Sequence, residues 1–432
     1  MLAESHIQKI APLNGKPHVV FVATRVPYPP VTGHYLRTLN ILRGLAQRFS
    51  VHFFGFRDVI HGTRDDHALG EETLRSICAS VYIEDVGAER SKARLLLDLV
   101  TSLLTCQPFT ARKYFSGTMR QAIQAVFERY EIAVVHADSL PSGQYLVDAP
   151  FPKLLTNHNV EYLRLYRYAS QRGSRLHRLA LWIQGWLTKR YEGKIMDSFG
   201  NCVAVSEEDK KELSSLAPDV RFFVVPNGTD TSEPLLPSAE QTALSALWVG
   251  GMNDEFNREA VIHFAFRILP RILEQVPEFK WIVVGRDPPA WLRTLAAEPS
   301  SGVVLTGFVP VVRDAYEQSA IVVAPMVSGG GTKLKVLEAM AMGRAVVTTP
   351  VGAEGIAVRD GVEMEIASND EEFARRVVAL LFDPARRRQM AAAARTVAER
   401  EYSWEVINHR MLAAVRAVMC SCPHGEAAAC AE

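Results

Sequence analysis

The sequence predicts two doubly wound α/β domains, and three observations support this fold class. The chain has 432 residues, which is too long for one ordinary core. Short apolar runs rich in β-branched residues alternate with helical patterns, as expected of parallel strands covered on both faces. The alternation occurs in two blocks, and a polar, proline-containing stretch at residues 229–243 separates them. Ligands of such folds bind beyond the carboxyl ends of the strands, so we expect a site in the cleft between the domains.

The first block begins with HVVFVAT at residues 18–24, which predicts a buried parallel strand. A loop with three prolines and Gly33 follows, and leucines then recur at helical spacing over residues 36–49. The run VHFFGF at 51–56 predicts the next strand, which completes a strand–helix–strand unit. We expect the remaining strands of this block at 132–138, 153–159, 201–206 and 222–228.

The second block repeats the pattern and ends in a helical region rich in Ala and Arg, at about residues 370–418. Its predicted strands lie at 246–251, 280–285, 302–308, 320–326 and 345–352.

The composition excludes several classes of function. Lys and Arg together number 48, as do Asp and Glu, so no overall charge favours nucleic acid as a partner. We find no secretory signal and no apolar run of the roughly 18 residues that a spanning helix needs. The six cysteines are sparse and do not suggest a disulfide framework, so we expect a reducing cytoplasm.

The stretch SGGGT at residues 328–332 forms a loop between a predicted strand and the helix KLKVLEAMAM. Glycines in such a loop let the backbone approach a ligand and direct free amides at it. Thr332 is expected to be the N-cap of the helix. The loop matches neither a Walker A sequence nor G-x-G-x-x-G, so a tight turn without a ligand is the alternative.

Lys333 and Lys335 stand at the helix end where the dipole is positive, and each costs about 0.3–1 kcal/mol there unless an anion is bound. A bound phosphate or diphosphate would make the electrostatic free energy of the two lysines favourable instead. Lys335 and Glu338 are three residues apart and share a helix face. This pattern favours a nucleotide, with the lysine and amides on phosphate and the glutamate on ribose; solvated lysines without a ligand are the alternative.

These residues carry a resemblance. The stretch GGGTKLKVLEAMAMGRAVVTTPVGAEGI at residues 329–356 resembles the donor-nucleotide motif of family 4 glycosyltransferases, which have the GT-B fold. Weaker matches occur in the same order over about residues 18–416. They are PYPPVTGHYLRTLNILRGLAQRFSV, NHNVEY, AVSEEDKKEL, VPNGTD, WVGG, VVGR, LTGFV and YSWE.

The resemblance implies two Rossmann-like domains facing across a cleft, with a C-terminal helix crossing back to the first. The acceptor-side domain would be residues 17–230, completed by 402–418, and the donor-binding domain residues 244–400. We expect 419–432 to be a disordered tail.

The implied activity is retaining transfer of a sugar from a UDP- or GDP-sugar to a saccharide or lipid-linked saccharide, for a surface polysaccharide. No metal or bound cofactor is required. Because no carboxylate nucleophile is evident, we expect front-face attack, in which the leaving phosphate takes the acceptor proton.

By similarity, Glu338 would hold the ribose, His158 would lie near the sugar and acceptor, and Lys335 would join them in catalysis. Phe308 and Val309 would line the base pocket. The other residues expected at the nucleotide-sugar are Gly33, Gly250, Gly251, Gly285, Arg286, Gly329, Gly330, Gly331, Thr332 and Lys333.

Three positions depart from the family pattern. Gly330 stands where a glutamate is usual, Gly251 where an arginine is usual, and Asn257 where a lysine is usual. One hypothesis is that Lys333 and Lys335 supply the missing phosphate charge. The alternative is an inactive GT-B scaffold or nucleotide-sugar-binding subunit. A dehydrogenase or epimerase is not favoured, because VATRVPYPPVTGHY lacks a dinucleotide fingerprint.

Two further features remain open. Asp138 and Ser139 end a predicted strand and could contact substrate or cap the next helix. Residues 161–195 carry a net charge of +6 with interleaved Trp and Leu. They suit either an interfacial helix on anionic lipid at the inner membrane face, or ordinary helices with a solvated basic face.

Overall fold

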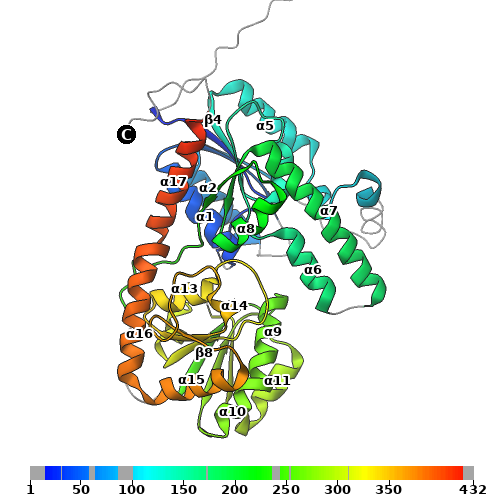
Figure 1. Cartoon of the computed structure of the whole chain (residues 1–432). Coiled ribbons are helices and arrows are strands. Elements are labelled where there is room, and N and C mark those ends of the chain that lie inside the picture. The colour runs from blue at the N-terminus through cyan, green and yellow to red at the C-terminus, as the bar shows by residue number, and fades with distance from the viewer. Residues whose placement is uncertain are drawn as a thin grey trace, which may run out of the picture. The chain divides into compact units, whose positions relative to one another are not determined.

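The computed structural model describes residues 15–30, 32–57, 64–85, 101–171, 174–235, 244–252, 254–309 and 311–421 (Figure 1). The chain divides into two compact units. The first comprises Met1–Val225 and Asn408–Glu432, and the second comprises Pro226–Ile407. The chain therefore returns to the first unit within its last helix, α17 (Trp404–Met419).

The first unit contains a seven-stranded parallel sheet with the order β3-β2-β1-β4-β5-β6-β7. The order reverses between β1 and β4, and in doubly wound sheets ligands bind at this switch point. Strand β1 is buried along its whole length, as its apolar run predicts. The strands are β1 (His18–Val22), β2 (Ser50–Arg57), β3 (Ser80–Asp85), β4 (Ile132–Ala137), β5 (Lys153–Thr156), β6 (Asn201–Ala204) and β7 (Arg221–Val224).

Helices connect these strands. In α1 the leucines at positions 39, 42 and 45 are buried, which confirms the predicted helix and its apolar face. Ser206 caps α8 by accepting from the amide of Asp209, so this residue has a structural role. The helices are α1 (Gly33–Ala46), α2 (Arg64–Ile77), α4 (Phe109–Lys113), α5 (Gly117–Arg129), α6 (Glu161–Gln171), α7 (Arg175–Phe199) and α8 (Glu207–Leu216), with a 3-10 turn at Leu140–Tyr145.

The second unit contains a six-stranded sheet with the order β10-β9-β8-β11-β12-β13. Its strand pairs are parallel, and its order reverses between β8 and β11. Trp281, Phe264 and Phe373 lie in its core. The strands are β8 (Ser245–Val249), β9 (Lys280–Val284), β10 (Val303–Gly307), β11 (Ile321–Ala324), β12 (Ala345–Thr348) and β13 (Glu365–Ile366).

The second unit's helices cover this sheet, and two short π-helical turns interrupt the pattern at Phe264–Ile268 and Ala398–Tyr402. A 3-10 turn lies at Pro299–Ser301. The α-helices are α9 (Glu255–His263), α10 (Leu269–Leu273), α11 (Ala290–Ala297), α12 (Arg313–Glu317), α13 (Leu334–Ala341), α14 (Pro350–Ala353), α15 (Asp370–Phe382) and α16 (Pro384–Val397).

Each strand predicted from the sequence is present, but β3 and β13 were not predicted. Strand β3 lies at the sheet edge and is only partly buried, and β13 has two residues, so neither leaves an apolar run. None of the described helices combines the length and apolar character that crossing a bilayer requires.

The cysteines only partly match the prediction. Cys78, Cys106 and Cys202 are free thiols, but Cys420 is disulfide-bonded, which the sparse spacing did not indicate. Most of the predicted tail 419–432 lies outside the described residues.

Candidate functional site

The glycine-rich loop joins β11 to α13 in the second unit. Gly329 and Gly331 have φ angles of 118° and 62°, in the left-handed region that favours glycine. The predicted N-cap is wrong, because Lys333, not Thr332, occupies the cap position of α13. The Thr332 hydroxyl instead accepts from the Asn227 amide at 3.3 Å, and Asn227 Nδ2 donates to the Thr332 carbonyl at 3.1 Å. Thr332 thus fixes the loop to the segment that precedes the second sheet.

The Lys333 ammonium is directed back into the loop. Its Nζ donates to the carbonyls of Gly330 at 3.0 Å and Gly331 at 2.8 Å, and Glu354 Oε2 lies 4.0 Å away. The residue is buried. The side chain therefore holds the loop in the left-handed backbone conformation of its glycines. The sequence suggested instead that the ammonium would contact a ligand.

The Lys335 ammonium contacts residues of other elements. It donates to Asn257 Oδ1 at 2.6 Å and lies 3.6 Å from the centre of the Trp248 ring. Asn257 Nδ2 in turn donates to the Gly251 carbonyl at 2.9 Å. Burial lowers the pKa of Lys335 to about 7, although the nearby Asp254 and Glu338 charges oppose this shift. A bound anion would favour the charged ammonium and so raise this pKa.

Glu338 lies one turn further along α13. Burial raises the pKa of its carboxyl to about 7, and Lys335 and the Tyr316 hydroxyl limit the shift. Tyr316 OH is 3.4 Å from Glu338 Oε2. Near neutral pH this carboxyl is therefore poised between its two protonation states and can accept or donate hydrogen bonds to a ligand hydroxyl.

Gly250 and Gly285 lie at the ends of β8 and β9, where the two backbones are close together. Because neither residue has a side chain, the Lys335 ammonium can lie beside them. A Cβ atom at Gly285 would lie 1.9 Å from the Gly250 carbonyl oxygen, and a Cβ at Gly250 would lie 3.0 Å from Lys335 Nζ. Only glycine fits at Gly285 without moving the strand ends.

The two residues predicted to line the base pocket, Phe308 and Val309, have different surroundings in the structure. Phe308 is exposed, and the Arg286 guanidinium lies 4.0 Å from the centre of its ring, which forms a flat cationic and aromatic surface. Val309 instead packs against the core of the second unit.

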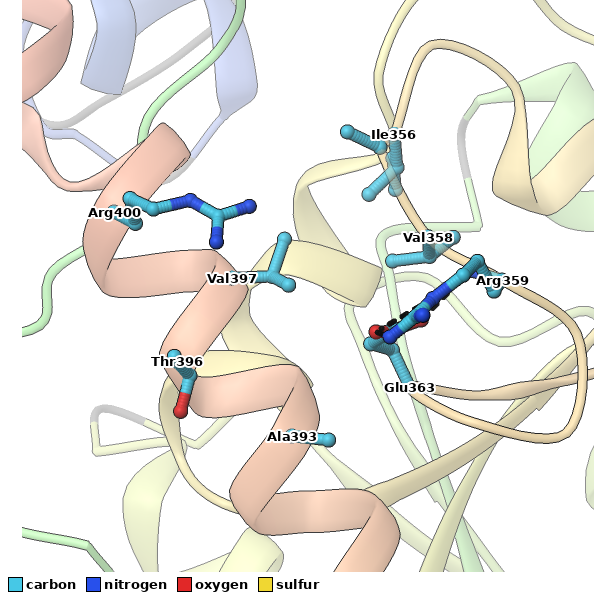
Figure 2. Close-up of a pocket in the computed structure, with 9 residues that line it drawn as sticks. Ile356, Val358, Arg359, Glu363, Ala393, Thr396, Val397 and Arg400 are labelled. Atoms are coloured by element: carbon cyan, nitrogen blue, oxygen red, sulfur yellow. Dashed lines mark hydrogen bonds and ion pairs between the residues drawn. The ribbon is translucent and has the colours of Figure 1, made fainter.

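A separate pocket of about 610 Å³ lies in the second unit between residues 356–363 and the end of α16. Arg359 forms an ion pair with Glu363 in its wall, with 2.6 Å between Nη2 and Oε1; Figure 2 draws the two side chains together. Arg400 pairs with Glu401 at 2.9 Å. None of the predicted site residues line this pocket, and its guanidiniums are already neutralised by carboxylates. We therefore do not place the functional site there.

In the first unit, three side chains meet at the end of the sheet where the strand order reverses. His158 Nε2 lies 3.4 Å from Asp138 Oδ1, and the rings of His34 and His158 are 4.2 Å apart. Gly33 precedes His34 at the start of α1, where the Thr32 hydroxyl accepts from the Tyr35 amide. The structure therefore brings the predicted Gly33 and His158 into one cluster.

Asp138 and His34 in this cluster differ in their charge at neutral pH. Burial opposes ionisation of Asp138, but His158, His34 and His136 outweigh it and hold the pKa of the carboxyl at about 2. Burial and His158 lower the pKa of His34 to about 3. At neutral pH Asp138 is a carboxylate and His34 is a neutral imidazole.

Comparison with known proteins connects these features. The model described as Glycosyltransferase Family 4 matches residues 31–233, and the model described as Glycosyl transferases group 1 matches residues 243–383. The chain belongs to the family 4 glycosyltransferases. A solved structure from Anabaena, Alr3699/HepE in complex with UDP and glucose, superposes with a TM-score of 0.61 at 13% identity and covers 93% of this chain and 100% of that chain. This likeness confirms the predicted GT-B fold class.

The curated relatives match in part. An uncharacterized 44.6 kDa protein in the cps region of Klebsiella pneumoniae is 24% identical over 140 residues, which are 31% of this chain and 36% of that protein. A phosphatidyl-myo-inositol mannosyltransferase from Mycolicibacterium smegmatis is 26% identical over 222 residues, 49% of this chain and 55% of that protein. The chain thus spans about one third to just over half of the length of these relatives.

Sequence reasoning missed several residues that shape the sites of this family 4 chain. Trp248 and Tyr316 are buried against Lys335 and Glu338, but they read as ordinary core aromatics. Thr38 and His34 lie on α1, and its leucine pattern gives no sign that these two side chains have a role at the site. The sequence marks Asn257 only as a departure from the family pattern, and its hydrogen bond to Lys335 appears only in the structure.

We predict that Lys333→Met lowers the free energy of unfolding of the second unit by about 1–3 kcal/mol, because two hydrogen bonds from a charged donor are lost. Urea unfolding followed by tryptophan fluorescence measures the change. Lys280→Met is the matched control, since Lys280 is exposed at the start of β9 in the same unit. Equal stability of both variants and the unaltered chain would contradict this role of Lys333.

Proposed function

We propose that this chain is a retaining glycosyltransferase that moves a sugar from a nucleotide-sugar to a saccharide or lipid-linked saccharide in polysaccharide or glycoconjugate biosynthesis. Residues 244–400 would bind the donor, and residues 17–230 with 402–418 would bind the acceptor.

The position of Lys335 is the observation that carries this proposal. The family pattern usually places cations at positions 251 and 257, where this chain has glycine and asparagine. The Lys335 ammonium contacts Asn257, and Asn257 contacts Gly251, so a cation from α13 occupies the region of the two absent ones. A scaffold without a nucleotide would gain nothing from a partly buried ammonium there, since partial burial already lowers the pKa of Lys335 and so costs stability. Lys335 therefore favours an active enzyme over the scaffold alternative.

The names of the relatives support the substrate classes. The Anabaena structure holds UDP and glucose, the Mycolicibacterium protein is named a mannosyltransferase of phosphatidyl-myo-inositol, and the Klebsiella protein belongs to a cps region. A UDP- or GDP-sugar donor fits the neighbouring Lys335 and Glu338, with phosphate at the ammonium and ribose at the carboxyl.

The chemistry that this arrangement suits depends on the leaving group. Negative charge grows on the departing diphosphate as the glycosidic bond breaks, and the loop amides with Lys335 would stabilise it. Attack on the same face, with the leaving phosphate taking the acceptor proton, would retain the anomeric configuration without a metal ion.

We predict that the affinity for UDP falls as the pH rises above about 7, approaching tenfold per pH unit, because free Lys335 loses its proton there while a bound diphosphate requires it. Isothermal titration from pH 7 to 9 measures this. Lys335→Met should weaken UDP binding and flatten its pH dependence, while uridine binding stays unchanged. Equal losses for UDP and uridine would show that Lys335 does not contact phosphate.

A second prediction separates the enzyme from the scaffold. Glu338→Ala should weaken donor binding by about 10- to 100-fold, the value of one or two charge-assisted hydrogen bonds to ribose, and lower transfer at least as much. Turnover is measured with the donor that gives the largest thermal shift among UDP- and GDP-sugars, and the anomeric configuration of the product is read by NMR.

Glu298→Ala, at an exposed position after α11, is the control for this experiment. Negligible transfer and hydrolysis by both the unaltered chain and Glu338→Ala would favour the scaffold. An inverted product would refute retention.

Helix α7 supports a lipid surface as a further partner. Leu176, Leu179, Trp182 and Trp186 recur at helical spacing and are exposed, Leu176 to 80% and Trp182 to 57%. The Arg190 guanidinium lies 5.0 Å from the centre of the Trp186 ring, and Arg175 starts the helix. Exposed apolar residues flanked by cations suit the interface of an anionic bilayer. We therefore propose a cytoplasmic protein that binds the inner membrane face through α7, near a lipid-linked acceptor.

We predict that replacing Arg175 and Arg190 with Gln weakens binding to vesicles of phosphatidylcholine with phosphatidylglycerol by about 30-fold, from roughly 1 kcal/mol for each cation. Co-sedimentation measures the partition. The control replaces Lys210 and Lys211 on α8, which removes the same charge from the same unit. Equal losses in both pairs would show that only net charge matters, and no loss would exclude α7 as the lipid surface.

A further inference from the structure

Asp138 is the most deeply buried member of the cluster in the first unit. It follows β4, and only 1% of its surface is exposed. Thr38 on α1 donates to its Oδ2 at 2.6 Å, and its Oδ1 lies 3.4 Å from His158 Nε2, an ion-pair distance at which the two atoms do not have hydrogen-bond geometry. The carboxylate is therefore fixed on one side by a hydroxyl and faces the imidazole on the other.

The ionisation of Asp138 determines which nitrogen of His158 holds a proton. A carboxylate can only accept hydrogen bonds, so the ring nitrogen that faces it is the N–H. In neutral His158 the proton is then on Nε2, and Nδ1 keeps its lone pair as an acceptor for a substrate hydroxyl. A buried carboxylate this close to a ring nitrogen repels a lone pair on that nitrogen, so it favours the tautomer that carries the proton there.

We propose that Asp138 is a positioning residue for His158. Thr38 holds Asp138, and Asp138 favours the Nε2–H tautomer of His158, which leaves Nδ1 as the acceptor for a substrate hydroxyl. The inference rests on the proposed function for the role of His158, but the tautomer itself is independent of any activity.

A metal ion is the rival explanation for the same side chains. His34, Asp138 and His158 offer ligand atoms that lie within 4.8 Å of one another. A tetrahedral zinc ion would bring its ligand atoms to about 3.4 Å of each other. Arg25 and Arg37 also add positive charge to this region, as their effect on His34 shows. This environment favours a cluster that holds protons over one that holds a divalent cation.

The first test measures the tautomer without substrate. Full-length protein labelled with ¹⁵N-histidine is examined by long-range ¹H–¹⁵N NMR, and the His158 signals are assigned by their loss in His158→Gln. We expect the Nε2–H pattern in the unaltered chain and a mixed or reversed pattern in Asp138→Asn. An unchanged pattern overturns the proposal.

The second test is a double-mutant cycle on transfer. Asp138→Asn should lower kcat by about 10- to 100-fold, the scale of a misplaced catalytic group, with little effect on UDP affinity. In a His158→Gln background the same substitution should have no further effect, because its whole action passes through His158. Independent, additive losses would show a structural role instead and overturn the proposal.

Two further measurements keep the result decisive. If Asp138→Asn does not fold, Thr38→Val replaces it, with a smaller loss of the Nε2–H form expected and an unchanged tautomer counting against the proposal. Binding of equimolar Zn²⁺ that Asp138→Asn and His34→Ala both abolish would identify a metal site and overturn it. If the unaltered chain transfers no sugar but shows the expected tautomer, the proposed function fails while the Asp138–His158 contact stands.

Discussion

Backbone contact between Gly250 and Gly285 is the constraint on which the proposed nucleotide site depends. A side chain at position 285 would collide with the Gly250 carbonyl, and one at position 250 would crowd the Lys335 ammonium. With glycine at both positions, the ends of β8 and β9 leave space beside the Trp248 ring for a cation from α13. The site thus forms where the strand order reverses between β8 and β11, as doubly wound folds require.

Lys333 at the cap of α13 and Lys335 within α13 have different roles, although the sequence presents them as a pair. Lys333 satisfies carbonyls of the loop that a left-handed backbone leaves without helical partners. Lys335 reaches across to α9 and meets Asn257. The helix-dipole argument therefore applies to Lys335, whereas Lys333 is compensated within its own loop and needs no anion.

The strands, the two-block organisation and the glycine-rich loop could be predicted because each leaves a local pattern of apolar runs or glycines. Side-chain directions could not, since they depend on partners far away in the sequence. The Thr332 hydroxyl bonds the amide of Asn227, 105 residues away in the sequence, and does not cap α13. The direction of the Lys335 side chain is set by its contacts with Trp248 and Asn257. Asp138 was noticed as a strand-end residue, but only the position of Thr38 on α1 shows that its carboxylate is held against His158.

Both units place a carboxyl group between a hydroxyl and a basic side chain, yet with opposite electrostatic outcomes. Asp138 lies among three histidines beside Thr38, and its interactions with these imidazoles, with His158 first, outweigh burial, so it is ionised before any ligand arrives. Glu338 has the Tyr316 hydroxyl and Lys335, and burial prevails over them. Because Lys335 and Glu338 both titrate near pH 7, a ligand that brings phosphate to one and hydroxyls to the other would fix both charges at once. The cluster of the first unit is thus ionised in advance, whereas Lys335 and Glu338 in the second unit would acquire their final charges only with the proposed nucleotide bound.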